Sequence, residues 1–283
     1  MQHDVIARET AHYQEHKRYI LHFLERDRTE CGRRLIRHIL ATWDRHLAFL
    51  DPAWVRGKRV IEVGCGNPRI VQYCKHLGAT RAIGNDLSPA FVARGLRRPH
   101  NYAYDAVFPA RHDDIELLYG DFNGPATKGL EVDTVMCFQS LHHIDLDAFV
   151  ATCNRILTPG GRVVISDPVG DHPLRRIGNW VGRLSGLLSP DEAALTPGRV
   201  AAAFGERGFI ETQRHSLNPT LEIFFHLTEL LEPLSGALAF WLKAPLALLR
   251  PLEDRLERTL LQRRPRLGWR FFLVMHKPGG NYA

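Results

Sequence analysis

One short stretch, KRVIEVGCGNP at residues 58–68, constrains this chain more than any other. Its first half is apolar and β-branched, which predicts a buried strand. Gly64 and Gly66 then allow a tight turn in which a bound molecule can come close to the backbone. Pro68 suits the first position of a helix, expected over 69–77, because its missing N–H costs nothing there. A strand, a glycine turn and a helix N-terminus form a cradle for an anionic or hydroxyl-bearing ligand.

The spacing of the glycines indicates which ligand the cradle fits. A dinucleotide fingerprint needs a third glycine in G-x-G-x-x-G, and that position is Arg69. The stretch resembles instead motif I of the class I S-adenosylmethionine (SAM) methyltransferases, in its E-x-G-x-G-x-G form. Glu62, Gly64 and Gly66 match this motif, whereas Pro68 replaces its last glycine. The departure affects the geometry of the turn.

A second feature of this family follows in the text GATRAIGNDLSP, where a strand expected over 80–85 ends at Asp86. The resemblance implies that the Asp86 carboxylate accepts hydrogen bonds from both ribose hydroxyls of the cofactor. The alternative is that Asp86 caps the helix that begins near Ser88. Ser88 and Pro89 already suit that capping purpose, so ribose binding is the favoured interpretation.

Two more family signatures occur in the expected order. Gly120-Asp121-Phe122 follows a strand expected over 115–119, and the resemblance implies that Asp121 binds the adenine amino group while Phe122 packs on the adenine ring. LTPGG at 157–161 precedes an apolar strand over 162–167, where its glycines are expected to turn the chain from helix to strand.

The reaction centre of the family lies just past the fourth strand, expected here over 133–138 and followed by QSLHHI. His142 and His143 are the candidates for a general base, which an acceptor hydroxyl or phenol would need. The alternative is that one histidine packs under the sheet edge and the other orders the loop. The resemblance assigns the cofactor to Glu62, Gly64, Cys65, Gly66, Asp86, Leu87, Asp121, Phe122 and Gln139.

The resemblance implies an α/β fold with a doubly wound seven-stranded sheet, whose last strand is antiparallel. Residues 1–55 show helical periodicity and are expected to form an N-terminal helical cap. Residues 56–283 would form the SAM-binding domain, with a helical insert at 218–268 between the sixth and seventh strands. The connection over 97–114 is expected to be rich in loops. Tyr13, His16 and Tyr19 in the cap are candidate lid residues, and packing of the cap on the sheet is the alternative.

The insert is the most unusual part of the chain. Its longest apolar run, 234–249, contains a lysine and a proline and is shorter than the roughly 20 residues that cross a membrane. The segment 243–270 then carries eight Lys or Arg and three Asp or Glu. Apolar helices with a basic flank suggest a lid over a lipophilic substrate, or a segment that rests on an anionic membrane. A dimer interface and additional core are the alternatives.

Composition sets few further limits. The net charge of +6 is compatible with an acidic partner, a membrane surface or nucleic acid, and selects none of them. None of the five cysteines forms C-x-x-C, which predicts reduced thiols and a cytoplasmic protein, with peripheral membrane contact as an addition. The close histidine groupings lack a third ligand at metal spacing, so we expect no metal site.

These features favour a SAM-dependent methyltransferase that acts on a small lipophilic or aromatic acceptor. The basic charge suggests an RNA or protein methyltransferase as an alternative. Against it, the chain lacks both an N/D-P-P-Y/F tetrapeptide after the fourth strand and a recognisable RNA-binding module. A non-catalytic SAM-binding protein and a nucleotide-dependent oxidoreductase are the remaining alternatives, and Arg69 argues against the oxidoreductase.

Overall fold

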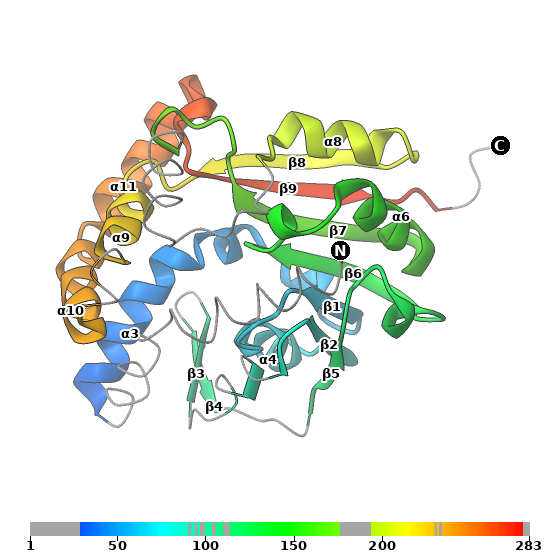
Figure 1. Ribbon diagram of the computed structural model, residues 1–283, viewed down its shortest axis with the longest axis horizontal. Helices are drawn as coiled ribbons and strands as arrows, with labels where there is room; N and C mark the ends of the chain where they lie inside the picture. The colour runs from blue at the N-terminus through cyan, green and yellow to red at the C-terminus, as the bar shows by residue number, and fades with distance from the viewer. Residues whose placement is uncertain are drawn as a thin grey trace.

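The computed structural model describes residues 29–89, 92–93, 96, 100–103, 106–109, 114–175, 194–229, 231 and 234–279. Its main sheet has seven strands in the order β5-β2-β1-β6-β7-β9-β8 (Figure 1). Strand β9 runs antiparallel to both of its neighbours, and the other pairs are parallel. This confirms the predicted fold. The strands are β1 (Arg59–Val63), β2 (Arg81–Asp86), β5 (Glu116–Tyr119), β6 (Val132–Phe138), β7 (Leu157–Pro168), β8 (Ile210–Leu217) and β9 (Arg270–His276).

Helices cover both faces of the sheet, and each face has its own apolar core. Helices α6 (Leu146–Ile156) and α8 (Pro197–Gly205) bury Phe149 and Phe204 against one face. Helix α4 (Arg69–His76) and the 3-10 turns η1 (Arg45–Phe49) and η2 (Pro52–Trp54) cover the other. The central strands are apolar on both sides, as expected for parallel strands covered by helices on both faces.

Further helices stand beside the carboxyl ends of the parallel strands (Figure 1). The N-terminal segment contributes α3 (Glu30–Trp43), and a small core joins it to the helices that follow β8 through Ile36, Ile39, Leu40, Phe225 and Phe240. The described parts of 1–55 and 218–268 are thus helical, and their division from the rest of the chain stays a prediction. The helices after β8 are α9 (Leu221–Glu229), α10 (Gly236–Ala247), α11 (Arg250–Leu256), η5 (Glu257–Leu261) and η6 (Pro265–Leu267).

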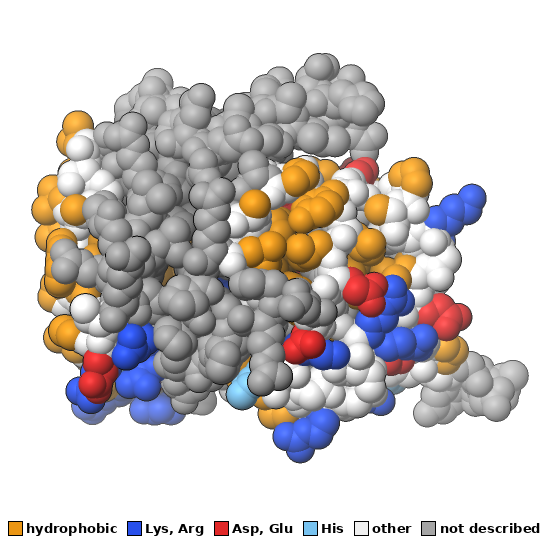
Figure 2. Space-filling model, turned by 90° about the horizontal axis from the view of Figure 1, so that it is seen from below, with side chains coloured by type: hydrophobic (Ala, Val, Ile, Leu, Met, Phe, Trp, Pro, Cys, Tyr) orange, Lys and Arg blue, Asp and Glu red, His pale blue; other side chains and the backbone are white. Residues whose placement is uncertain are grey.

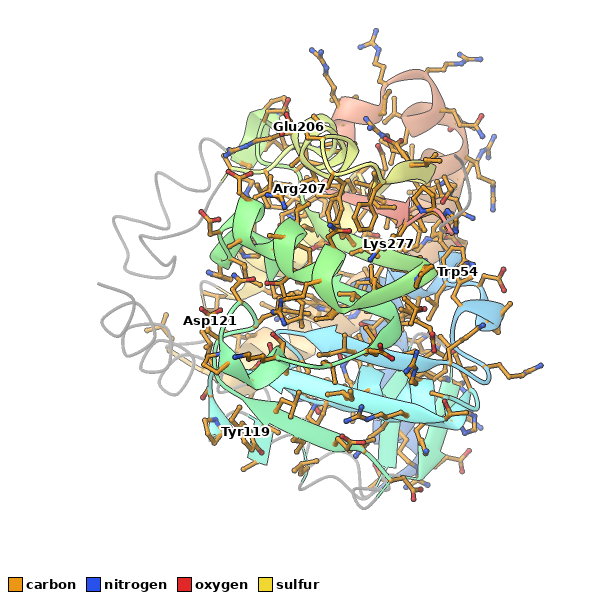
Figure 3. All side chains as sticks on the ribbon, turned by 90° about the vertical axis from the view of Figure 1, so that its right-hand side faces the viewer. Trp54, Tyr119, Asp121, Glu206, Arg207 and Lys277 are labelled. Atoms are coloured by element: carbon orange, nitrogen blue, oxygen red, sulfur yellow. The ribbon has the colours of Figure 1, made fainter. Side chains whose placement is uncertain are left out.

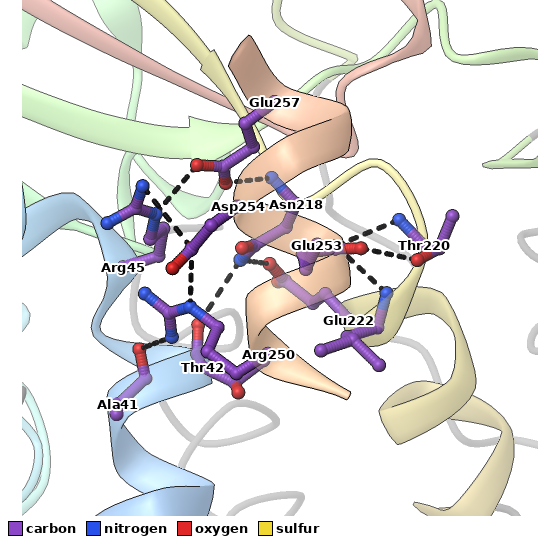
Figure 4. Close-up of polar contacts among 11 residues, drawn as sticks. Ala41, Thr42, Arg45, Asn218, Thr220, Glu222, Arg250, Glu253, Asp254 and Glu257 are labelled. Atoms are coloured by element: carbon purple, nitrogen blue, oxygen red, sulfur yellow. Dashed lines mark hydrogen bonds and ion pairs between the residues drawn. The ribbon is translucent and has the colours of Figure 1, made fainter. Parts of the chain in front are cut away.

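A buried polar network holds these helices to the sheet (Figure 4). Asn218, at the end of β8, donates from its backbone to Glu257 over 3.0 Å and from its side chain to Glu222 over 2.6 Å. Glu222 is also paired with the fully buried Arg270 at the start of β9. Arg45 reaches Glu257 over 2.7 Å. The N-terminal segment, the sheet and the insert therefore share one set of buried charges.

Two predictions of local structure are wrong. The connection over 97–114 contains a β-hairpin, because β3 (His100–Ala103) pairs antiparallel with β4 (Ala106–Pro109). Pairing satisfies backbone groups of this long connection, and Tyr102, Val107 and Phe108 in the two strands are β-formers. The expected turn at 157–161 belongs to β7 itself, which pairs with β6 both before and after a register irregularity.

Several remaining predictions differ little or are outside the described part of the chain. Pro68 is the residue immediately before α4, one position earlier than expected. The proposed lid residues Tyr13, His16 and Tyr19 lie outside the described residues. Among the residues that are described, each helix is too short or too polar to cross a bilayer.

Candidate functional site

The sheet register brings the predicted site residues to one edge. Val63 of β1 pairs with Asn85 of β2 on one side and with Cys137 of β6 on the other. Asp86 pairs with Tyr119 of β5, the strand at the border of the sheet (Figure 3). Since parallel strands end at the same edge, the turns after β1, β2, β5 and β6 are neighbours there.

Asp86 is bound directly to the glycine turn. Its carboxylate accepts a hydrogen bond from the Gly66 N–H over 2.7 Å and another from the Ser88 N–H over 2.8 Å. Burial raises the pKa of Asp86, and these N–H groups oppose that rise. Each carboxylate oxygen has two lone pairs, so each can accept a further hydrogen bond, such as one from a ribose hydroxyl. The capping role and the ribose-binding role predicted for Asp86 are therefore compatible.

Gly64 marks a close approach between the turn and the loop after β6. Its φ of +67° is in the left-handed region, and a Cβ built there would lie 2.4 Å from the Ser140 Cβ. The Ser140 hydroxyl donates to the Val63 carbonyl over 2.7 Å and holds the two loops together. Only glycine fits this position.

Glu62 lies beneath the turn and is almost fully buried. Its Oε2 atom has no hydrogen-bond partner among the described residues. Burial raises the pKa of Glu62 well above its usual value, and the Arg69 guanidinium partly opposes this. A buried oxygen with unused acceptor capacity marks a place where a ligand hydroxyl, amine or water can bind.

The other predicted cofactor residues occupy different positions around the turn. Cys65 is buried and its thiol packs toward Gly84, whereas Leu87 is 36% exposed. Asp121 follows β5 and accepts from the Asn123 N–H over 2.9 Å. Phe122 is buried in the core, its ring 5.3 Å from that of Phe149, so it supports the loop that carries Asp121.

The loop after β6 begins with a strained residue and leads to the two histidines. Gln139 has a φ of +57°, and its N–H donates to the Ser166 carbonyl of β7 over 2.8 Å. His142 and His143 lie in the 3-10 turn η4 (Leu141–His143), with their ring centroids 4.1 Å apart. A left-handed conformation at a non-glycine residue is uncommon, and such conformations cluster at functional sites.

His142 is held by a carboxylate that the sequence did not single out. Its Nδ1 lies 3.0 Å and 3.1 Å from the two oxygens of Asp167, at the end of β7. Asp167 is fully buried, and His142 nearly so. Contact with a carboxylate places the proton on Nδ1, which makes Nε2 the basic nitrogen. The signal was the polar end of the apolar run VVISD, the same pattern that revealed Asp86.

His46, in η1, is a second residue that sequence reasoning missed. It is 1% exposed, and its ring centroid lies 4.3 Å from that of Phe138, the last residue of β6. Neither ring nitrogen has a hydrogen-bond partner among the described residues. Burial and the charges of Arg270 and Arg69 lower the pKa of His46 well below its usual value, so the ring stays neutral. Nothing in the sequence distinguishes it among fifteen histidines.

Arg69 also gains a role that its sequence position did not reveal. It replaces the third glycine of the dinucleotide fingerprint, and its guanidinium makes two contacts with the fully buried carboxylate of Asp44. This pair links the N-terminal segment to the start of α4. Within the described part of the chain, no group of three or more His, Cys, Asp or Glu is placed to hold a metal ion.

Comparison with known proteins agrees with this geometry. A family model described as a methyltransferase domain matches residues 61–165, from β1 to β7. The match falls on the part of the chain that carries the resemblance to class I methyltransferases. The cofactor of that class is SAM, and the residues present fit it: a glycine turn that a Cβ would obstruct, a carboxylate at the end of β2, and an unsatisfied oxygen on Glu62.

Individual relatives cover different shares of the chain. A ubiquinone biosynthesis O-methyltransferase of Thiobacillus denitrificans is 33% identical over 111 residues, 39% of this chain. The match spans 44% of that relative's length. The cyclopropane synthase MmaA2 of Mycobacterium tuberculosis has a TM-score of 0.55 at 18% identity, over 84% of this chain and 83% of that one. The magnesium protoporphyrin IX methyltransferase of Synechocystis PCC 6803, solved with bound SAH, has a TM-score of 0.51 at 13% identity, over 88% of each chain. At these identities the two structures show the fold of the methyltransferase domain.

Proposed function

We propose that this chain transfers the methyl group of SAM to a hydroxyl on a small lipophilic or aromatic acceptor. The observation that carries the proposal is the buried His142–Asp167 pair at the carboxyl edge of the sheet. A hydroxyl must lose its proton as it is methylated, whereas a thiolate or an amine has less need of a base. The name of the Thiobacillus relative, an O-methyltransferase, supports the same chemistry.

The residues of the glycine turn would bind and orient the cofactor. Bound SAM supplies a methyl group that is already strongly electrophilic. Asp86 would accept hydrogen bonds from the ribose hydroxyls, and Asp121 would accept one from the adenine amino group. Gly64 and Gly66 let the ligand lie against the backbone. Because the cofactor brings its own activation, most of the protein's contribution is to place the acceptor in line, and positioning of this kind is worth roughly 7–11 kcal/mol.

His142 would then remove the proton of the acceptor. Asp167 orients the ring through Nδ1 and stabilises the imidazolium that forms, so Nε2 can take the proton of the hydroxyl. His143 packs against this ring and would position it. General-base catalysis of this kind contributes typically 10²- to 10⁴-fold in rate.

The proposal of a lipophilic acceptor comes from the helices at the same edge. The insert places α9 and α10 against α3 beside the strand ends, and its side chains are mostly apolar. These helices would form a roof that excludes water from the acceptor. Contact of the insert with a membrane, as a source of lipophilic acceptor, belongs to the same proposal.

Cofactor binding is the first test. We expect micromolar binding of S-adenosylhomocysteine by calorimetry, and no binding of NAD or NADP. Asp86→Asn should weaken binding at least tenfold, since a hydrogen bond to a charged group contributes roughly 1.5–3 kcal/mol. Glu206→Gln, an exposed acid near the opposite end of the sheet, is the matched control (Figure 3). Equal binding by Asp86→Asn and the parent would contradict the proposed site.

Methyl transfer is the second test, with alkylated phenols and alcohols as acceptors beside tRNA, rRNA and protein extracts. We expect His142→Gln to lower kcat for a phenol by 10²-fold or more, with little change in KM. Asp167→Asn should lower kcat and shift the pH profile, as a positioning residue does. Methylation of RNA or protein alone would favour those alternatives. Cofactor binding without transfer to any acceptor would favour a non-catalytic SAM-binding protein.

A further inference from the structure

Helix α10 is apolar around its whole circumference. Its sequence, GALAFWLKAPLA, contains one charged residue, Lys243, which is 1% exposed and lies 5.7 Å from the Trp43 ring centroid. One side of the helix buries Phe240 in the core shared with α3 and α9. The other side presents Leu238, Trp241 and Leu242, which are 39–47% exposed. A helix that is hydrophobic all round needs cover on every side, and this one has it on one side only.

The exposed apolar surface continues beyond α10. Single exposed leucines are ordinary in globular proteins, but a contiguous group of large apolar side chains marks a surface that binds something. Figure 2 shows hydrophobic side chains gathered along the margin that the insert helices form. We call this group the apolar margin: it comprises Phe224, Leu227, Leu234, Leu238, Trp241, Leu242, Leu248, Leu249 and Leu252, each at least 39% exposed.

The charges that follow α10 are sorted by sign. The acids there face the protein: Glu253 accepts from the Thr220 and Leu221 backbone, and Glu257 from Asn218 and Arg45 (Figure 4). The remaining acid after α10 accepts from Arg250 over 2.8 Å. The exposed charges of 251–268 are therefore arginines alone, which we call the arginine group: Arg255, Arg258, Arg263, Arg264 and Arg266.

We propose that the insert docks on the surface of an anionic phospholipid bilayer. The apolar margin would enter the boundary between headgroups and acyl chains, and the arginine group would bind lipid phosphates. Nucleic acid would meet the arginines but leave the apolar margin uncovered. A symmetric dimer would cover the apolar margin but would give the arginine group no acidic partner from the same segment, because the acids there are bound within the protein.

Docking of this kind would serve the proposed function but does not depend on it. The insert stands at the edge where the strands end, so a lipophilic acceptor could pass from the bilayer to the site; this part of the inference rests on the proposed function (Figure 1). Binding to vesicles requires neither cofactor nor acceptor. A failure of membrane binding is thus separate from a failure of methyl transfer.

The test is sedimentation of the full chain with vesicles of phosphatidylcholine, with and without phosphatidylglycerol. We expect at least tenfold tighter binding to the anionic vesicles, weakened by salt, and a blue shift of tryptophan fluorescence that Trp241→Phe reduces. Leu238→Ser/Leu242→Ser should lose binding at least tenfold. Arg263→Glu/Arg264→Glu should lose the preference for anionic lipid. Both pairs are exposed, so folding should be unaffected, as thermal melts would verify.

Ile210→Ser and Arg207→Glu are the matched controls, because both residues are exposed and lie at the opposite end of β8 from the insert. They should bind vesicles like the parent. The proposal is overturned if the parent chain binds neither vesicle, or if the margin variants bind as well as the parent. It is also overturned if the parent is a dimer in solution that Leu238→Ser/Leu242→Ser dissociates. S-adenosylhomocysteine binding by every variant, measured in parallel, reports on the cofactor site alone.

Discussion

Gly64 and Gly57 both adopt left-handed backbone conformations, with φ of +67° and +71°, but their surroundings differ. A Cβ on Gly57 meets nothing within 4 Å, whereas one on Gly64 would collide with Ser140. Gly57→Ala should cost only the backbone term, about 1–2 kcal/mol. Gly64→Ala should cost more and should also weaken S-adenosylhomocysteine binding, because the loop after β6 must move. Chemical unfolding and calorimetry measure both effects, and equal losses in the two variants would contradict the close approach.

The buried imidazole of His46 should lower the free energy of unfolding. A buried polar group without a hydrogen-bond partner costs roughly 1–3 kcal/mol, so His46→Phe, which keeps the ring packing on Phe138, should stabilise the protein by about 1–2 kcal/mol. If the imidazole binds the acceptor, the same change should raise the acceptor KM. Leu47→Met, a volume-conserving change in the same turn, is the control for packing alone. A destabilised His46→Phe protein would show that the imidazole has a structural partner.

At the scale of elements, one acid joins two helices of the insert. Glu253 of α11 is almost fully buried and accepts from the backbone of Thr220 and Leu221, where α9 begins, and from the Thr220 hydroxyl. It therefore satisfies N–H groups at the first turn of α9. Because Glu253 is buried, it adds no exposed negative charge beside the arginine group of 251–268.

Removal of this cap should loosen the insert while leaving the sheet intact. Glu253→Ala leaves buried N–H groups unsatisfied and should cost about 1–3 kcal/mol. Limited proteolysis should then cut near 218–230 faster, and S-adenosylhomocysteine should still bind. Glu253→Gln keeps one acceptor oxygen and should lose less. Unchanged cleavage in Glu253→Ala would show that the insert is held by its apolar contacts alone.

At the scale of the whole molecule, buried histidines should make stability depend on pH. Burial lowers the pKa of His46, His172 and His215 in the folded state. Below the ordinary value of 6.5, the unfolded chain binds protons that the folded chain does not, so stability should fall as the pH drops from 7 toward 5. The fully buried His46 contributes up to about 1.4 kcal/mol per pH unit, and the more exposed His172 and His215 contribute less.

Buried carboxyls act in the opposite direction, and a difference measurement separates the two. Burial raises the pKa of Glu62, Asp86 and Glu253, so their protonation in the folded state relieves a penalty as the pH falls. His46→Phe removes one histidine and leaves these carboxyls in place. Denaturant titrations at pH 7 and 5.5 should show a smaller loss for His46→Phe than for the parent. The groups that act on His46 from neighbouring elements are Arg69 and Arg270.

Much of the sheet could be predicted because short local sequence patterns indicate its strands. Runs such as RVIEV and VDTVMCF are short, apolar and followed by polar or glycine residues. Such runs form strands whichever neighbouring strand they pair with. The hairpin within 97–114 was missed because its pairing depends on which residues meet, and a loop-rich composition does not reveal that.

The sequence by itself determined where the strands lie along the chain, the glycine turn, and the positions of Asp86 and Asp121 after their strands, since each depends on neighbours in the chain. Only the tertiary structure decided what depends on residues far apart. Asp167 at the end of β7 reaches His142 in the loop after the neighbouring strand β6, Arg69 binds Asp44, and Glu253 caps a helix that precedes it in the sequence. The physical reason is that hydrogen bonds and burial are properties of places in space. A carboxylate in the sequence carries no record of the partner that folding brings to it.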